Sequence, residues 1–204
     1  MELVLEPFGD AAWRVRLPSV GNRRALLDTL RRLPQVIDAV VCEQHAVVTF
    51  EPAAPPEAAS FRDAIASALT APEQGSAPGT HVVRVRYDGA DLSELARGIG
   101  LPRDELVSLH AGQVYVVAAM GFQPGFGYLR GLDPRLVVPR RASPRHRVPA
   151  LSVAIAGPYT GVYPFSSPGG WHLVGTAVGF SPFDARLGAT LALGDQVRFV
   201  PEGT

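Results

Sequence analysis

The residues best suited to chemistry are arginines gathered between positions 130 and 147. Six guanidinium groups fall in this segment, which contains a single acid, Asp133. Guanidinium forks stay charged at physiological pH and bind carboxylate or phosphate through two parallel hydrogen bonds, so several that converge would form an anion site. The same run also fits a solvated loop whose arginines pair with acids of this chain or of a partner. The six are Arg130, Arg135, Arg140, Arg141, Arg145 and Arg147.

Two glycine-rich segments place large aromatic residues beside glycines. They read GFQPGFGYL at residues 121–129 and SPGGW at residues 167–171. Glycine permits positive φ and close approach of backbone N–H groups to a ligand, while aromatic rings can line an apolar pocket. N–H donors in such a pocket suit an oxyanion or a lactam carbonyl. The alternative is that the aromatic rings pack a core and the glycines turn corners.

His110 faces the first of these segments in sequence. It ends an expected helix, so it is either an acid/base or a helix C-cap that bonds a carbonyl. The other four histidines show no metal-ligand spacing, and we expect no metal site. No Gly-x-Ser-x-Gly motif occurs, which disfavours a serine nucleophile.

Composition excludes several functions. The formal net charge is zero and all 19 basic residues are Arg, so a nucleic-acid binder is disfavoured and no lysine exists for a P-loop or Schiff base. The single Cys42 permits no internal disulfide. The longest apolar run, residues 114–120, is shorter than the roughly 20 residues of a membrane helix. We therefore expect a cytoplasmic protein.

The pattern of residues 1–75 predicts a small α+β domain of ferredoxin-like character. Alternating apolar residues predict strand pairs within residues 3–17 and 36–50, while helical spacing predicts one helix over residues 22–33 and another after residue 56. Strand pair, helix, strand pair, helix is the resulting order.

A linker at residues 71–79, rich in Pro, Gly and Ser, precedes a second domain at residues 80–204. The spacing of Asp91 and Glu94 predicts a capping box at the start of a short helix. Many short strands and turns after residue 113 then predict an irregular β-barrel.

The order of motifs resembles one known family. GFQPGFGYLRGLDPRLVVPRRASPRHRVPALSVAIAG, then TGVYPFSSPGGW, then GDQVRFVP, are similar to the KipI/PxpB family, also called allophanate hydrolase subunit 1. The resemblance is specific from about residue 107 to residue 201 and looser before. It implies a cyclophilin-like β-barrel behind a small N-terminal domain.

Three functions follow from this resemblance. PxpB members are one subunit of an ATP-dependent 5-oxoprolinase, which opens the lactam of 5-oxo-L-proline to give L-glutamate. They act with a subunit 2 of KipA/PxpC type and a third subunit of PxpA type, so ATP belongs to the complex and the chain alone is expected to be inactive. A related domain pair belongs to biotin-dependent urea carboxylase, and KipI-type members bind and inhibit a histidine kinase.

The resemblance also implies a cleft, although the chain departs from the usual pattern at Tyr159 and at Gly175-Thr176-Ala177, where an arginine is often found. We expect His110, Arg140 and Arg145 to be catalytic. The substrate or anion site is expected to contain Gly121, Phe122, Pro124, Gly125, Phe126, Tyr128, Arg147, Thr160, Gly161, Tyr163, Ser167, Pro168, Gly169, Gly170 and Trp171.

Overall fold

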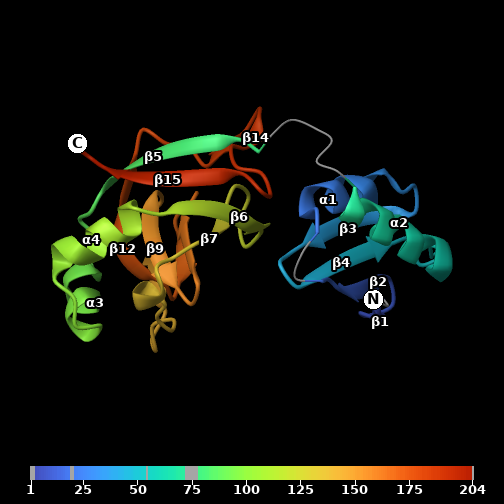
Figure 1. The fold of residues 1–204 in the computed structure, drawn as a ribbon, viewed down its shortest axis with the longest axis horizontal. Helices are drawn as coiled ribbons and strands as arrows, with labels where there is room; N and C mark the ends of the chain where they lie inside the picture. The colour runs from blue at the N-terminus through green and yellow to red at the C-terminus, as the bar shows by residue number, and fades with distance from the viewer. Residues whose placement is uncertain (1–2, 19–20, 54, 72–77, 204) are drawn as a thin grey trace. The chain divides into compact units, whose positions relative to one another are not determined.

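The chain forms two compact units, Met1–Ala77 and Pro78–Thr204 (Figure 1). The computed structural model describes residues 3–18, 21–53, 55–71 and 78–203. Most of the linker expected at residues 71–79 therefore lies outside the described residues. No helix in the described ranges is long and apolar enough to cross a membrane.

The first unit is a four-stranded antiparallel sheet with two helices on one face (Figure 1). The sheet order is β1-β2-β4-β3, and every second residue of β4 is buried, as a half-covered strand requires. Trp13 packs edge-on against Phe50 and Phe61, which joins the sheet to α2. The elements are β1 (Leu5–Pro7), β2 (Ala12–Arg16), α1 (Arg23–Arg32), β3 (Val36–Val41), β4 (His45–Phe50) and α2 (Ala58–Thr70).

The order of elements in this unit is that expected from the sequence, strand pair, helix, strand pair, helix. Helix α1 begins after Asn22, whose side chain accepts from the backbone N–H of Ala25, and Glu57 caps α2 in the same way. A ferredoxin-like unit has the order β-α-β-β-α-β, so the ferredoxin-like description is not confirmed.

The second unit is built on a closed seven-stranded barrel with the order β10-β7-β6-β15-β5-β12-β9. Only the β5–β15 pair is parallel among the barrel pairs of the described chain. Helices α3 and α4 pack onto the same core as the inward-facing strand residues. A barrel in this region is what the sequence predicts; its cyclophilin-like character stays a prediction.

Two short ribbons stand outside the barrel, β8 paired with β11 and β13 paired with β14. The elements of this unit are β5 (Thr80–Arg86), α3 (Leu92–Gly98), α4 (Arg103–Ala111), β6 (Val114–Met120), β7 (Gly127–Arg130), the 3-10 helix η1 (Pro134–Leu136), β8 (Arg145–Val148), β9 (Ser152–Ala156), β10 (Tyr159–Val162), β11 (Ser167–Gly169), β12 (His172–Val178), β13 (Phe183–Asp184), β14 (Gly188–Ala189) and β15 (Gln196–Pro201).

Candidate functional site

An aromatic layer lies on the outer side of the barrel wall, separate from the barrel core. Ala154 and Ala156 of β9 belong to this layer, whereas their neighbours Val153 and Ile155 belong to the barrel core, because successive strand residues face opposite sides. Phe126 is at the centre of the layer and makes four edge-on ring contacts. We call the set Phe122, Phe126, Tyr128, Tyr159, Tyr163 and Trp171 the aromatic layer.

Glycines allow this layer to pack. A Cβ on Gly161 would lie 2.9 Å from the carbonyl oxygen of Gly127 and 3.1 Å from the ring of Phe126. A Cβ on Gly169 would lie 2.5 Å from the hydroxyl oxygen of Tyr163. The absence of a side chain at these two glycines therefore lets the protein's own rings and backbone approach closely. Gly121 and Gly170, by contrast, have only open space or ordinary contacts around them.

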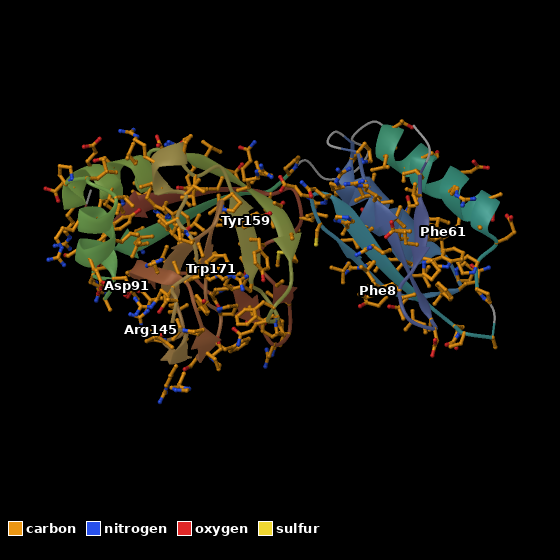
Figure 2. All side chains as sticks on the ribbon, turned by 90° about the horizontal axis from the view of Figure 1, so that it is seen from below. Phe8, Phe61, Asp91, Arg145, Tyr159 and Trp171 are labelled. Carbon is orange, nitrogen blue, oxygen red and sulfur yellow. The ribbon has the colours of Figure 1, made fainter. Side chains whose placement is uncertain are left out.

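Asp91 binds two of the arginines of the 130–147 segment. Its side chain is 3% exposed and is held by Arg145 at both oxygens, Nη2–Oδ1 at 2.6 Å and Nη1–Oδ2 at 2.9 Å. Arg141 Nη1 donates to Oδ1 at 2.7 Å, and the backbone N–H of Leu173 donates to Oδ2 at 2.7 Å. The Asp91 cluster, Asp91 with Arg141 and Arg145, thus ties the start of α3 to β8 and β12 (Figure 2).

This arrangement corrects the expected capping box. Asp91 does precede α3, but its side chain makes no capping hydrogen bond to that helix. Burial by itself raises the pKa of Asp91, yet the hydrogen bonds from Arg145 and Leu173 and the charges of both arginines outweigh burial and lower the pKa. Asp91 is therefore ionised at neutral pH. Two guanidinium groups against one carboxylate leave the Asp91 cluster with one net positive charge.

The six arginines do not all converge. Arg135 binds Asp133 and Glu105, which directs it to α4, and Arg147 donates to the hydroxyl of Ser166. Arg130 is an exposed residue at the end of β7. Arg140 is also exposed, and its charge acts on the Tyr163 hydroxyl together with that of Arg145. Burial raises the pKa of Tyr163 to about 12 despite these two charges. Among the described residues, Arg140 and Arg145 of the Asp91 cluster therefore act on Tyr163 of the aromatic layer, and Arg130 lies opposite Tyr159 in the β7–β10 pair.

His110 lies inside the barrel, away from solvent. Its side chain is fully buried and stacks on Phe199 with ring centroids 4.7 Å apart. Its Nδ1 lies 2.8 Å from the Tyr87 hydroxyl and its Nε2 lies 2.9 Å from Thr160 Oγ1. The Thr160 hydroxyl in turn donates to the carbonyl of Ala154 at 3.0 Å.

The hydrogen-bond directions follow from the number of available protons. The Thr160 hydroxyl donates its one proton to the carbonyl of Ala154, so its oxygen must accept from His110 Nε2–H. The other ring nitrogen of His110, Nδ1, then accepts from the Tyr87 O–H. Burial lowers the pKa of His110 to about 3, in agreement with a neutral ring. A general acid/base must reach its substrate, so this position does not support the catalytic role expected for His110; Thr160 likewise belongs to the barrel interior.

Some buried polar atoms near the aromatic layer lack a partner. Among the described residues of the second unit these are Arg141 Nε, Ser167 Oγ and Gln123 Oε1. Ser167 belongs to β11 and Gln123 to the turn that precedes Phe126. Unpaired buried polar groups are costly, so each of the three lowers the stability of the fold as it stands.

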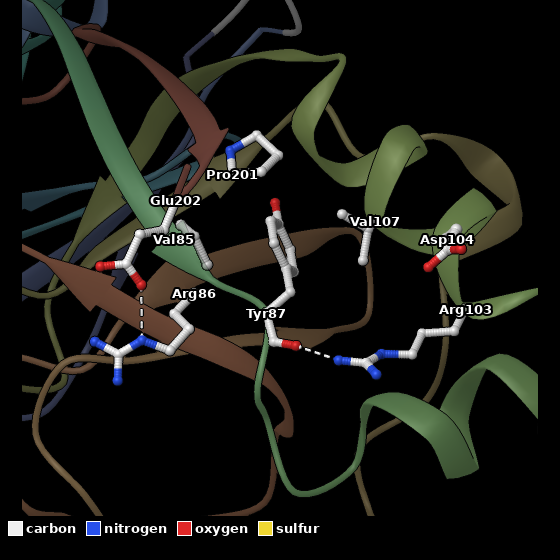
Figure 3. A pocket seen from close by; sticks show the side chains of 8 residues that line it. All are labelled: Val85, Arg86, Tyr87, Arg103, Asp104, Val107, Pro201 and Glu202. Atoms are coloured by element: carbon white, nitrogen blue, oxygen red, sulfur yellow. Dashed lines mark hydrogen bonds and ion pairs between the residues drawn. The ribbon is translucent and has the colours of Figure 1, made fainter. Parts of the chain in front are cut away.

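A pocket of about 310 Å³ lies elsewhere on the second unit, between β5, α4 and β15 (Figure 3). Both of its arginines are engaged with neighbours: Arg86 Nε donates to Glu202 at 2.7 Å, and Arg103 donates to the backbone carbonyl of Tyr87 at 2.7 Å (Figure 3). Tyr87 contributes its side chain to the pocket lining, while its hydroxyl binds His110. None of the site residues expected from the sequence lines this pocket. Its lining residues are Val85, Arg86, Tyr87, Arg103, Asp104, Val107, Pro201 and Glu202.

The structure thus brings together most of the expected site residues and separates a few. Pro124 and Pro168 are exposed, and Gly125 packs against the backbone of Pro182. Within the described ranges, no group of three or more His, Cys, Asp or Glu side chains is placed to hold a metal ion. At the two places where the chain departs from the usual family pattern, Tyr159 joins the aromatic layer and the Thr176 hydroxyl donates to Asp88. Sequence reasoning missed Asp91 as a site residue, because its only local signal was a helix start.

Comparison with known proteins shows which family this chain resembles. Residues 3–188 match the family model "Carboxyltransferase domain, subdomain C and D". The B-type subunit of 5-oxoprolinase from Escherichia coli O157:H7 is 50% identical over 125 residues, which are 59% of this chain and 57% of that protein. The protein of the same name from Bacillus subtilis (strain 168) is 44% identical over 113 residues, 55% of this chain and 47% of that protein. The matches thus span about half the length of these curated relatives.

Solved structures share the fold. A protein named TTHA0988 is 35% identical with a TM-score of 0.78, covering 95% of this chain and 40% of that one. Kluyveromyces lactis urea carboxylase matches with a TM-score of 0.70, covering 98% of this chain and 22% of that chain. Its sequence identity is 15%, so this match shows a likeness of fold alone. From the family match and these relatives, the chain belongs to the carboxyltransferase subdomain C and D family and, within it, to the KipI/PxpB family.

Proposed function

We propose that this chain is the B-type subunit of a heteromeric, ATP-dependent 5-oxoprolinase that opens the lactam of 5-oxo-L-proline to give L-glutamate. The observation that carries the proposal is the identity of 44–50% to three proteins that are named as this subunit of 5-oxoprolinase. A protein with that name works within a complex of several subunits. The companions proposed here are a KipA/PxpC-type subunit and a PxpA-type subunit.

The chemistry around the aromatic layer suits such a substrate. 5-Oxo-L-proline carries one carboxylate, a lactam carbonyl and a lactam N–H on a small apolar ring. The net positive charge of the Asp91 cluster and the exposed Arg140 favour the carboxylate.

The proposed role of this chain is to bind and orient the substrate. His110 is neutral and buried, and the Tyr163 hydroxyl keeps its proton at neutral pH, so neither provides a base at the aromatic layer. Lactam hydrolysis is uphill without coupling, and ATP supplies that coupling in the complex. We assign no residue of this chain to ATP, because Arg141 and Arg145 are already bound to Asp91. The isolated chain is therefore expected to be inactive.

Reconstitution tests this function. The chain is mixed with the KipA/PxpC-type and PxpA-type proteins of its own genome, and glutamate release from 5-oxo-L-proline is measured with and without ATP. Product is expected only when all the proteins and ATP are present. Arg140→Ala is expected to lower kcat/KM at least about tenfold, whereas Arg198→Ala, an exposed arginine on β15, serves as a matched control. An intact assembled complex that releases no glutamate would remove this function.

A second candidate, biotin-dependent carboxyl transfer, is favoured by the matching family model itself, which describes a carboxyltransferase domain. This chain holds no lysine for biotin attachment, so a separate biotinylated protein would be needed. Incubation of the complex with a biotin carrier, bicarbonate, ATP and urea distinguishes the two candidates. Carboxylated urea product without glutamate formation would favour the second.

A further inference from the structure

Exposed apolar side chains gather beside the aromatic layer. Phe122 is 57% exposed, Phe165 is 43% exposed and Leu187, in the turn between β13 and β14, is 88% exposed. Phe183 of β13 is half-buried. We call these four residues the apolar rim. Large apolar groups that are brought together on a surface mark interaction sites, whereas scattered single ones do not.

Contacts join the segments of the three phenylalanines of the apolar rim, and Leu187 lies in the turn of the same β13–β14 ribbon as Phe183. The rings of Phe165 and Phe183 lie 5.8 Å apart, and the Phe122 ring lies 6.0 Å from that of Tyr163, two residues before Phe165. The turn that holds Phe122 abuts the β13–β14 ribbon, because a Cβ on Gly125 would lie 2.8 Å from the Cβ of Phe183. Three chain segments therefore meet at the apolar rim.

The backbone of Phe122 adds an independent observation. Its φ is +69°, a left-handed conformation that bulky residues rarely adopt. Such unfavourable conformations persist where the surrounding structure enforces them, and they concentrate at functional sites. Here the conformation accompanies a ring that is mostly exposed yet touches Phe126 and Tyr163. A partner that covers the ring would bury apolar area that is now in contact with water.

The comparisons suggest what covers the apolar rim. This fold occupies only 40% of the TTHA0988 chain, so in that protein most of the polypeptide lies outside it. The curated relatives are each named as one subunit of 5-oxoprolinase, and that name implies companion subunits. The net charge of this unit also favours a protein partner. Residues 81–204 contain 12 Arg and 9 acidic residues, and this excess of positive charge favours a partner surface with acidic groups.

We propose that the apolar rim is the docking surface for the companion KipA/PxpC-type subunit, a folded protein that presents apolar and acidic groups to it. This inference rests on the proposed function. Docking there covers Phe122 and brings groups of the companion next to Tyr163 and Arg140, so the complete site is composed of both subunits. The missing acid/base of this chain then comes from the companion.

Binding measurements test the docking surface. The affinity of the full chain for the purified KipA/PxpC-type protein is measured by calorimetry, with Phe165→Asp and Leu187→Asp as variants. Each is expected to raise Kd at least about tenfold, as charged groups do at the centre of an apolar interface. Val82→Asp is the matched control, because Val82 is 61% exposed on β5, and its Kd is expected to stay within about twofold of wild type.

The outcomes separate this inference from the proposed function. Tight binding by wild type with unchanged Kd in both rim variants would overturn the docking surface and leave the function standing. No binding by wild type, together with no glutamate release, removes both. Leu187 is so exposed that its variant is expected to fold normally, which unfolding curves verify. Self-association of the wild-type chain that the rim variants abolish would show that a second copy occupies the rim, which also overturns the proposal.

Discussion

At the residue scale, the most consequential side chain is Asp91. Its side chain does not cap α3, contrary to the sequence prediction, but makes four hydrogen bonds to groups that are 50 to 82 residues away in sequence. A buried carboxylate that neutralises part of two guanidinium charges holds the segment 141–145 against the barrel. Of the two arginines expected to be catalytic, Arg145 is therefore bound to Asp91, and Arg140 is the one proposed to meet a ligand.

We predict that Asp91→Asn lowers the free energy of unfolding by about 3 kcal/mol, because two partly buried guanidinium groups lose their carboxylate. Glu94→Gln, an exposed acid in the first turn of the same helix, is expected to cost less than about 1 kcal/mol. Urea denaturation at pH 7 measures both. Equal effects of the two substitutions would contradict the role assigned to Asp91.

His110 makes stability depend on pH. Its pKa is lowered to about 3 in the folded chain, whereas an unfolded histidine titrates near 6.5, so the unfolded state binds more protons between these values. The stabilisation is complete above about pH 6.5 and is lost as the pH falls, by at most about 1.4 kcal/mol per pH unit.

We therefore predict that wild type loses unfolding free energy between pH 6.5 and 5, where few carboxyl groups titrate. A His110→Asn variant, although less stable at every pH, is expected to show a smaller slope in this window. Denaturation curves at pH 5, 6 and 7 check this. Identical slopes would contradict a neutral, buried His110.

At the scale of elements, the structure distinguishes two adjacent glycines that look alike in sequence. Gly169 faces Tyr163, and a Cβ there would lie 2.5 Å from the hydroxyl oxygen; Gly170 has its nearest neighbour, Pro144, at 3.7 Å. We predict that Gly169→Ala costs about 1–3 kcal/mol and alters the near-ultraviolet circular dichroism of the aromatic layer, as overpacking does. Gly170→Ala is expected to change stability by less than about 0.5 kcal/mol. A reversed order would contradict the packing described here.

Local patterns predicted the elements well and their partners poorly. Helical spacing located α1 and α2, and alternation located β3 and β4, because these signals depend only on neighbouring residues. The motifs around residues 121–129 and 167–171 likewise indicated where aromatic rings gather. The sequence could not show that His110 points into the barrel or that Arg135 turns to Glu105, since both depend on contacts between distant segments.

At the scale of the whole molecule, the role proposed for this chain is to supply a binding surface at which neither His110 nor Tyr163 acts as a base. Its buried titratable groups are paired or neutral, and its exposed apolar rim adjoins the expected site. Such a division of labour fits a protein that works only as part of a complex. Arg145→Ala is therefore a poor probe of catalysis, because it also breaks the Asp91 cluster; Arg140→Ala leaves that cluster intact.

The most direct measurement is the rate of ATP-dependent glutamate formation from 5-oxo-L-proline by the companion subunits, with this chain added or omitted. We predict that the rate rises from background only when the chain is present, and that the Arg140→Ala chain assembles normally but restores at most about a tenth of the rate. An equal rate in the absence of the chain, or full activity of the Arg140→Ala complex, would contradict the binding role proposed here.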